Sequence, residues 1–386
     1  MLYHLSTHLT SVWGPFRLLS SYLVLIGLGA ALSALVVGVL MPRFWHILPT
    51  DRGRAFAQHA NAARGKPTGA GFLVVLLLLP VLLLVVPLNL KMGSIMVCLV
   101  LAMVTGYLDD RSSNPWGDYF KGSLDIIVAV LTSIAFCQLQ PVHCWLPFVK
   151  GEFIVPVWAF IPLASLLLWI TINATNCSDG VDGLAGSLTM LSLFYLGFFL
   201  YVVVGHVEAA AYLLVLHNPE GARWAVLLFA VMGGLAGYLW HNAEPSRVLM
   251  GDAGSRFLGL LVGVAVLASG NPFVILVVAP VVLVNGGSGI VKIALLRMFK
   301  RMGLDVRPPQ ITKPSPQLPL PGILPPVPVD DGRRHLFVTL LHKVRFPLHD
   351  HFRKNLGWSN AQVLVRFMLV QSFLTPLLFV ILVKLR

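Results

Sequence analysis

The sequence predicts an all-α, polytopic integral membrane protein with about ten transmembrane helices. Of its 386 residues, 57% are hydrophobic and only 11% are charged, whereas soluble domains carry about 25% charged residues. The mean hydropathy is +0.81. Apolar runs of roughly 17 to 25 residues, the length at which a helix spans a bilayer, recur along the whole chain.

Short polar segments separate these runs, and we predict one helix for each. The expected spans are Leu18–Met41, Thr68–Val86, Met92–Leu108, Ser123–Cys137, Pro156–Ile172, Leu184–Val204, Trp224–Trp240, Ser255–Ser269, Pro272–Leu296 and Gln362–Val383. The first run is long and no small-residue cleavage site follows it, so we expect a retained helix and no signal peptide. Residues 1–386 are predicted to form a single membrane-embedded domain. Its segment 308–328 is so rich in proline that we expect an extended, PPII-like cytoplasmic insertion without a chemical role.

The distribution of Lys and Arg predicts that both termini face outward, toward the periplasm, because cytoplasmic loops carry the basic residues. The loops after the odd-numbered spans hold most of them: Arg43, Arg52, Arg54, Arg64, Lys66, Arg111, Lys121, Arg247 and a cluster from Arg297 to Arg366. The opposite loops and the termini hold only Arg17, Lys91, Lys150, Arg223, Lys384 and Arg386. The net charge of +12 then indicates a cytoplasmic surface that faces anionic membrane lipids and anionic substrates. Nucleic acid is not expected as a partner, because no binding fold for it is evident.

Asp109 and Asp110 end the third predicted span, in "GYLDD". Adjacent carboxylates repel each other, and the dipole at a helix C-terminus disfavours them further, unless a cation or a proton lies between them. The pattern therefore indicates a positive partner. The alternative is a pair of solvated charges that marks the membrane interface.

Asn173, Asn176, Asp179 and Asp182 recur every three residues in "NATNCSDGVDGLAG". In a helix this spacing turns all four toward one face, and such a face suits hydroxyls, phosphates and a hard cation. The alternative is a polar loop with Asx turns.

Asp252 lies in a Gly-Asp-Ala-Gly-Ser run that leads into the eighth predicted span. An Asp at this position can bind Mg²⁺ while the N–H groups of the helix start meet phosphate oxygens. Together with the other carboxylates at the same membrane face, it predicts a site for a Mg²⁺-pyrophosphate complex.

A cytoplasmic loop, "PLHDHFRKNLGW", contains His349, Asp350, His351, Arg353 and Lys354. This cluster can bind a diphosphate and exchange protons near neutral pH. The alternative is a basic interfacial segment that touches lipid headgroups.

Six segments in order resemble the phospho-N-acetylmuramoyl-pentapeptide transferase family, which belongs to the polyprenyl-phosphate N-acetylhexosamine-1-phosphate transferase superfamily. They are "MLYHLS", "RGKPTGAG", "GYLDD", "NATNCSDGVDGLAG", "WHNAEPSRVLMGDAGSRFLG" and "PLHDHFRKNLGW". The resemblance implies a ten-span enzyme of the bacterial cytoplasmic membrane, with its active site on the cytoplasmic face. It implies Mg²⁺-dependent transfer of phospho-MurNAc-pentapeptide from UDP-MurNAc-pentapeptide to undecaprenyl phosphate, giving lipid I and UMP in peptidoglycan biosynthesis. It also implies a homodimer.

Residue by residue, the resemblance assigns Asp109 and Asp110 to the lipid-phosphate end of the site, with Lys121 behind them. It assigns Asp252 to Mg²⁺, and His349 and His351 to the catalytic set. The residues that it places near substrate are Lys66 and Thr68 in the loop near uridine, Asn173, Asn176, Asp179 and Asp182 on the central polar face, and Asn242 in the WxN motif.

The chain departs from the family pattern at several of these positions. Asp350 replaces the middle member of three consecutive His residues, and Leu249 replaces an aromatic residue three positions before Asp252. The loop between Asp110 and Lys121 is shorter than usual, and a glutamate expected near residues 285–287 is missing. The Pro-rich insertion is additional.

The expected mechanism is attack by a lipid phosphate oxygen on the sugar-bearing phosphorus, with UMP as the leaving group. We expect Mg²⁺ on Asp252 to bridge the diphosphate, Lys121, His349 and His351 to offset further charge, and Asp109 to take the lipid-phosphate proton. An Asp that acts as a covalent nucleophile is the alternative. Competing functions are a related sugar-1-phosphate transferase, a weakly active paralogue and, least favoured, a cation-coupled transporter.

Overall fold

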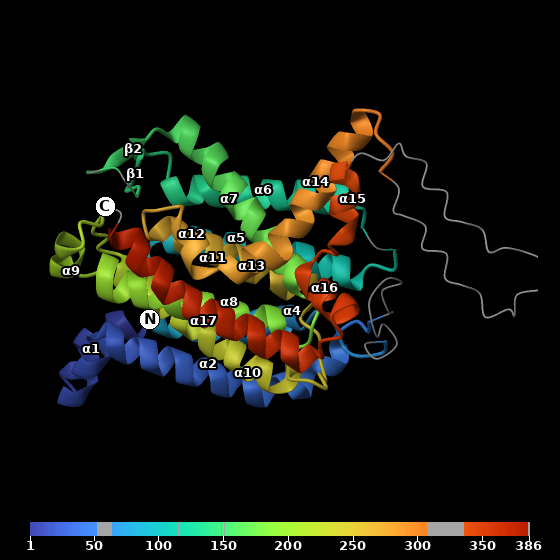
Figure 1. The fold of residues 1–386 in the computed structure, drawn as a ribbon. Helices are drawn as coiled ribbons and strands as arrows, with labels where there is room; N and C mark the ends of the chain where they lie inside the picture. The colour runs from blue at the N-terminus through green and yellow to red at the C-terminus, as the bar shows by residue number, and fades with distance from the viewer. Residues whose placement is uncertain (52–63, 115, 148, 150, 307–335, 385–386) are drawn as a thin grey trace, which may run out of the picture.

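The computed structural model describes residues 1–51, 64–114, 116–147, 149, 151–306 and 336–384, most of them in helices (Figure 1). In chain order the helices up to the middle of the sequence are α1 (Leu2–Thr10), η1 (Gly14–Ser20), α2 (Tyr22–Phe44), η2 (Trp45–Ile47), α4 (Ala70–Val85), α5 (Leu90–Arg111), α6 (Asp118–Cys137), α7 (Val157–Ser178), α8 (Leu184–Phe198) and η3 (Phe199–Val204). The later ones are α9 (Val207–Tyr212), α10 (Gly221–Asn242), α11 (Gly251–Ala268), α12 (Val274–Val278), α13 (Pro280–Val282), η4 (Leu283–Gly287), α14 (Ser288–Arg301), α15 (Leu336–Lys343), α16 (Leu348–Asn355) and α17 (Asn360–Lys384). A small antiparallel hairpin pairs β1 (Val142–Cys144) with β2 (Phe153–Val155). The Pro-rich segment 308–328 and the basic residues Arg52, Arg54, Lys150 and Arg386 lie outside the described residues.

Each of the ten predicted spans overlaps a helix, so the all-α membrane architecture is confirmed. Within the described part of the chain, nine helices are long and apolar enough to cross a membrane. The second predicted span corresponds to α4, which has only 16 residues. At 1.5 Å per residue it is about 24 Å long, shorter than a hydrocarbon core of about 30 Å.

The ninth predicted span is not one continuous helix, which corrects the sequence prediction. α12 ends at Val278, Ala279 leaves helical geometry with φ −131° and ψ 39°, and Pro280 begins α13. Proline has no backbone N–H to continue the preceding helix. A single π-helical turn, η4, then leads into α14, which projects from the bundle beside α15 in Figure 1. Hydropathy does not reveal the break because apolar residues lie on both sides of it.

α11 is the central helix of the bundle. All of its residues from Gly251 to Ala268 are buried, and α4, α5, α7 and α8 pack around it. After the polar residues of its first turns, α11 is apolar on every side, as is typical of a helix in the interior of a bundle. The packing therefore brings the start of α11, with Asp252, among the ends of its neighbours.

The two chain termini lie at the same end of the bundle, as predicted, and α14 and α16 lie at the opposite end (Figure 1). At that opposite end, Asn360 at the start of α17 donates a hydrogen bond to Glu244 in the loop before α11, at 3.0 Å. The start of α11 is therefore at the end away from the termini. All four cysteines are free thiols.

Candidate active site

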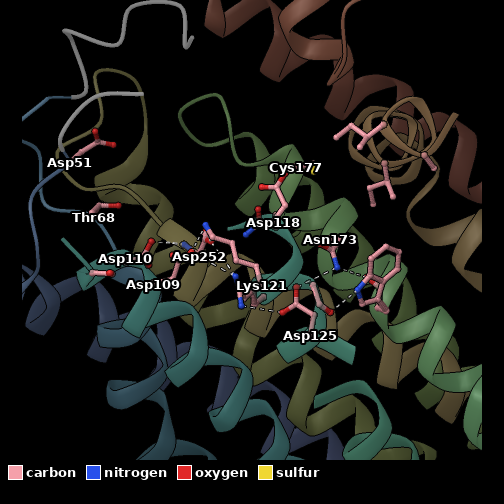
Figure 2. A pocket seen from close by; sticks show the side chains of 18 of the residues that line it. Asp51, Thr68, Asp109, Asp110, Asp118, Lys121, Asp125, Asn173, Cys177 and Asp252 are labelled. Carbon is pink, nitrogen blue, oxygen red and sulfur yellow. Dashed lines mark hydrogen bonds and ion pairs between the residues drawn. The ribbon is translucent and has the colours of Figure 1, made fainter. Parts of the chain in front are cut away.

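A cavity of about 680 Å³ opens at the bundle end that is away from the termini. Figure 2 shows that carboxylates and one lysine from separate helices point into it. The predicted site residues that line it are Thr68, Asp109, Asp110, Lys121, Asn173, Asn176 and Asp252. Further lining residues include Asp51, Asp118, Asp125, Trp169, Cys177, Arg256, Ile290, Ile293, Ala294 and Arg297.

Asp110 caps the start of α11 from the last turn of α5. Its Oδ1 accepts the backbone N–H of Asp252 and its Oδ2 accepts that of Ala253, each at 3.0 Å. These N–H groups have no partner within their own helix, and the helix dipole favours a negative charge beside them. Gly251 makes the turn possible because its φ is +71°, a conformation that residues with a Cβ rarely adopt. Asp110 thereby finds the positive partner that the sequence indicates.

Asp109 has a different partner, the side chain of Lys121 at the start of α6. The ammonium group of Lys121 contacts Oδ2 of Asp109 and lies 3.3 Å from Oδ2 of Asp252. Oδ1 of Asp109 accepts the backbone N–H of Trp116 at 3.3 Å. One cation thus joins two carboxylates that come from α5 and α11, two helices that would otherwise bring like charges together.

Asp125 and Arg256 also belong to this cluster, and neither was predicted from the sequence as a site residue. Arg256 Nη1 lies 3.1 Å from Oδ1 of Asp125, and Nη2 lies 3.4 Å from Oδ2 of Asp252 and 3.7 Å from Oδ2 of Asp109. Two signals were available in the sequence. Asp125 is a carboxylate inside an apolar span, which by default marks a functional position, and Arg256 follows Asp252 by four residues, the spacing of helix neighbours.

Asn173 and Asn176 of α7 line the next part of the cavity. Asn173 donates to Oδ2 of Asp125 at 3.4 Å, and Asn176 donates to the hydroxyl of Ser255 at 3.0 Å. On the side of α14, the wall is formed by Ile290, Ile293 and Ala294, with Arg297 at the same wall. The cavity therefore combines a charged floor with one apolar side.

The predicted common face of four polar residues is only half formed, because α7 ends at Ser178. Asp179 and Asp182 lie beyond the helix and do not line the cavity. Asp182 instead accepts the backbone N–H of Ser246 at 3.1 Å and lies 4.0 Å from the ammonium of Lys66. The spacing of three residues predicted one face, but the helix does not continue far enough to create it.

Lys66 and Asn242 hold loops beside the cavity. Lys66 donates to the hydroxyl of Ser246 at 3.1 Å. Asn242, which is buried, accepts the backbone N–H of Gly183 at 2.8 Å and donates to the carbonyl of Val248 at 2.7 Å. These contacts join the loop after α7 to the loop before α11. Leu249, at the position of the expected aromatic residue, pairs through its backbone with Pro67 and Ala70.

His349 and His351 lie on α16 and are not among the lining residues of the cavity. The backbone N–H of His349 donates to Oδ1 of Asn285 at 2.9 Å, and its Nδ1 lies 3.2 Å from the same oxygen. Its Nε2 faces Gly180 so closely that a Cβ there would overlap the ring. Burial lowers the pKa of His349 to about 4, so the ring is neutral at pH 7. This placement differs from the expected charged group at the diphosphate.

Asn285 occupies the region where a glutamate was expected. It is buried, and besides accepting from His349 it donates to the hydroxyl of Ser178 at 3.1 Å. His351, on the exposed side of α16, lies 3.1 Å from the amide of Asn355. Asp350 turns toward its own helix, with Lys354 at 3.0 Å and Arg353 at 3.8 Å. The carboxylate is thereby paired with cations one turn away.

The sequence is similar to a family of glycosyl transferases and to several bacterial proteins of one name. The family model described as Glycosyl transferase family 4 matches residues 92–270. The phospho-N-acetylmuramoyl-pentapeptide-transferase of Treponema pallidum (strain Nichols) is 43% identical over 387 residues, which cover 98% of this chain and 95% of the relative. The protein of the same name in Opitutus terrae is 28% identical over 390 residues, 95% of each chain. That of Bartonella quintana is 27% identical over 287 residues, 73% of this chain and 69% of its own.

Proposed function

Because this chain belongs to the phospho-N-acetylmuramoyl-pentapeptide-transferase family, we propose that the cavity at the start of α11 is its active site. The protein is a membrane enzyme that transfers phospho-MurNAc-pentapeptide in peptidoglycan biosynthesis. UDP-MurNAc-pentapeptide is the donor and undecaprenyl phosphate the acceptor, and lipid I and UMP are the products. The observation that carries this proposal is the convergence of Asp109, Asp110, Lys121 and Asp252 from three helices in one cavity.

The two sides of the cavity suit the two substrates. The UDP-sugar is anionic and large, and it enters from water. The acceptor has an anionic phosphate on a long apolar chain. Ile290, Ile293 and Ala294 on α14 offer an apolar wall to such a chain. Lys121 lines the same cavity, where it contacts Asp109 and Asp252, and it is placed to neutralise phosphate charge. Charge neutralisation is the main requirement, because both reacting groups are negative.

The carboxylates fit Mg²⁺ by their chemistry. Within the described residues, no three His, Cys, Asp or Glu side chains form a ready-made metal site. Mg²⁺ does not require one, because it is usually bound by one or two carboxylates, with waters and substrate phosphates completing its shell. We propose that Asp252 holds the ion. When bound, Mg²⁺ would supply positive charge to the diphosphate and to the leaving UMP.

The residues of the chain then have separate tasks in the transfer. A phosphate oxygen of the lipid attacks the sugar-bearing phosphorus, a new P–O bond forms, and the P–O bond to UMP breaks, with the electron pair leaving on UMP. Asp109 is placed to accept a proton from the lipid phosphate, and Lys121 offsets the charge of the attacking and leaving groups. Asp110 fixes the start of α11 through two backbone hydrogen bonds and so fixes Asp252.

The test is a turnover assay of the purified protein with UDP-MurNAc-pentapeptide, undecaprenyl phosphate and Mg²⁺. We expect a lipid-linked product and UMP in equal amounts. Product from UDP-GlcNAc instead would favour a related sugar-1-phosphate transferase. Ion flux into proteoliposomes without any product would favour a transporter, and lipid-phosphate binding without turnover would indicate a weakly active paralogue.

We place the active site on the cytoplasmic face, following the distribution of basic residues. Single cysteines introduced into a cysteine-free background at Gln140 and Glu208, which are exposed at the end of the termini, should react with an impermeant reagent in intact cells. Cysteines at Asn114 and Met302, exposed just after the ends of α5 and α14, should stay unmodified until the membrane is permeabilised. The reverse labelling would overturn the orientation.

A homodimer stays a prediction, which mass measurement in detergent micelles tests.

A further inference from the structure

Asp125 and Arg256 form a buried ion pair next to the active-site carboxylates, and the mechanism above uses neither residue. Arg256 Nη1 lies 3.1 Å from Oδ1 of Asp125, and the two side chains are 2% and 6% exposed. Burying two charges in a membrane-spanning bundle is costly even when they are paired. Apolar side chains at both positions would avoid this cost. Stability alone therefore does not explain why the ion pair is present.

The guanidinium of Arg256 also reaches the two carboxylates that the proposed mechanism needs. Nη2 lies 3.4 Å from Oδ2 of Asp252 and 3.7 Å from Oδ2 of Asp109. The same two oxygens contact the ammonium of Lys121. Two cations, one from α6 and one from α11, therefore bridge one pair of oxygens. Figure 2 shows Asp109, Lys121, Asp125 and Asp252 together in the cavity.

The pair changes the geometry of the cluster more than its net charge. Asp125 contributes one negative charge and Arg256 one positive charge, so the formal charge of the cavity is the same with or without them. The pair instead fixes the orientation of the Arg256 guanidinium. A guanidinium is planar, and different nitrogens face Asp125 and Asp252, so Asp125 on α6 sets the orientation that Arg256 presents to Asp252.

We propose that Arg256 is a positioning residue, which holds the carboxylates of Asp109 and Asp252 at a fixed separation, and that Asp125 anchors it. The inference rests on the proposed function of the cavity, because it concerns the carboxylates assigned there to Mg²⁺ and to proton transfer. Lys121 also bridges the two acids, but its side chain is 29% exposed. The buried guanidinium of Arg256 is a second, fixed cation that keeps the acids together before substrate and metal arrive.

The experiment compares the parent protein with Arg256→Leu and with the double variant Asp125→Leu/Arg256→Leu. The double variant removes both charges and leaves no unpaired charge in the interior, so it separates positioning from simple loss of folding. Asp125→Asn/Arg256→Gln, which keeps hydrogen-bonding groups at both positions, provides the same comparison if the apolar pair does not fold. Two quantities are measured: steady-state kcat and KM, and the affinity for Mn²⁺ by EPR titration of protein without substrates.

For Arg256→Leu we expect kcat to fall at least tenfold, with KM for the UDP-sugar within threefold of the parent. Mn²⁺ should bind at least threefold more tightly, because a fixed positive charge close to Oδ2 of Asp252 is gone. Slower turnover with tighter metal binding is not the signature of a damaged fold, which weakens both. In the double variant kcat should stay within threefold of that of Arg256→Leu.

Two results would overturn the inference. One is turnover of the double variant within threefold of the parent, which would make the pair dispensable for catalysis. The other is unchanged or weaker Mn²⁺ binding in Arg256→Leu, because the loss of a positive charge 3.4 Å from Oδ2 of Asp252 should make binding tighter. Failure of the proposed function is distinguished from both, because it appears as an inactive parent, while the Mn²⁺ titrations still compare the variants without any substrate.

Discussion

Gly106 of α5 packs directly against the backbone carbonyl of Asp252, so closely that a Cβ at residue 106 would overlap the carbonyl group. The contact explains how α5 and α11 approach each other near the cavity. It also lets Asp110, one turn later on α5, reach the N–H groups of Asp252 and Ala253. The position of the Asp252 carboxylate therefore depends on a residue without a side chain.

Gly106→Ala should lower both stability and turnover. The added methyl group forces α5 and α11 apart, a type of overpacking that costs about 1 to 3 kcal/mol, and the displacement falls on Asp252. Thermal unfolding in detergent and the turnover assay measure the two effects. Gly93→Ala is the matched control on the same helix, because nothing lies within 4 Å of a Cβ at that position. Equal behaviour of the two variants would contradict the close contact.

The sequence predicted much of this cavity and little of its geometry. Asp109, Asp110 and Asp252 were found because carboxylates at the ends of apolar spans are unusual, and Lys121 because of the family resemblance. The pair of Asp125 and Arg256 was missed because its partners are 131 residues apart, and no local pattern joins them. The break at Ala279 was missed because hydropathy does not register a change of backbone direction.

The placement of His349 predicts a specific pH dependence. Its pKa in the folded protein is lowered to about 4 by burial, whereas an unfolded chain has a His pKa near 6.5. Between these values the unfolded state binds a proton that the folded state does not. Burial of neutral His349 therefore does not change the free energy of unfolding with pH above about pH 6.5. As the pH falls from 6.5 toward 4, the free energy of unfolding decreases, by a total on the order of 3 kcal/mol.

His349→Gln removes this titration while an amide can still donate to Asn285. We expect the unfolding temperature of the parent to drop more steeply than that of the variant between pH 7 and pH 5. All other histidines are common to both proteins, so the difference between the two curves isolates residue 349. Parallel curves would mean that His349 is accessible to protons in the folded state.

Asp350 separates this chain from the family pattern, and the structure shows it paired with Lys354 and Arg353 on its own helix. Asp350→His should therefore change turnover by no more than about twofold, because a partly exposed ion pair contributes only about 0 to 1 kcal/mol. Rates measured at saturating substrates decide the point. A rise of roughly tenfold or more would show a charge penalty at the diphosphate, since 1.36 kcal/mol corresponds to a factor of ten.

The contacts of Asp110 argue against a role for it as a covalent nucleophile. Both of its oxygens accept backbone N–H groups at the start of α11. A nucleophile would have to give up such contacts. Without the lipid acceptor, we expect no release of UMP from the UDP-sugar and Mg²⁺. A rapid burst of about one UMP per protein molecule would support the covalent alternative.

The central claim is that Asp252 in this cavity carries the Mg²⁺-dependent transfer. The most direct measurement is the rate of lipid-linked product formation by Asp252→Asn across a Mg²⁺ titration. Glu208→Gln is the control, because it changes an exposed carboxylate on α9 at the other end of the bundle. We predict that Asp252→Asn loses at least 100-fold in turnover, roughly the 2.7 kcal/mol that one lost electrostatic contact in a transition state can cost, while Glu208→Gln matches the parent. Near-parent turnover of Asp252→Asn with an unchanged Mg²⁺ dependence would contradict the claim.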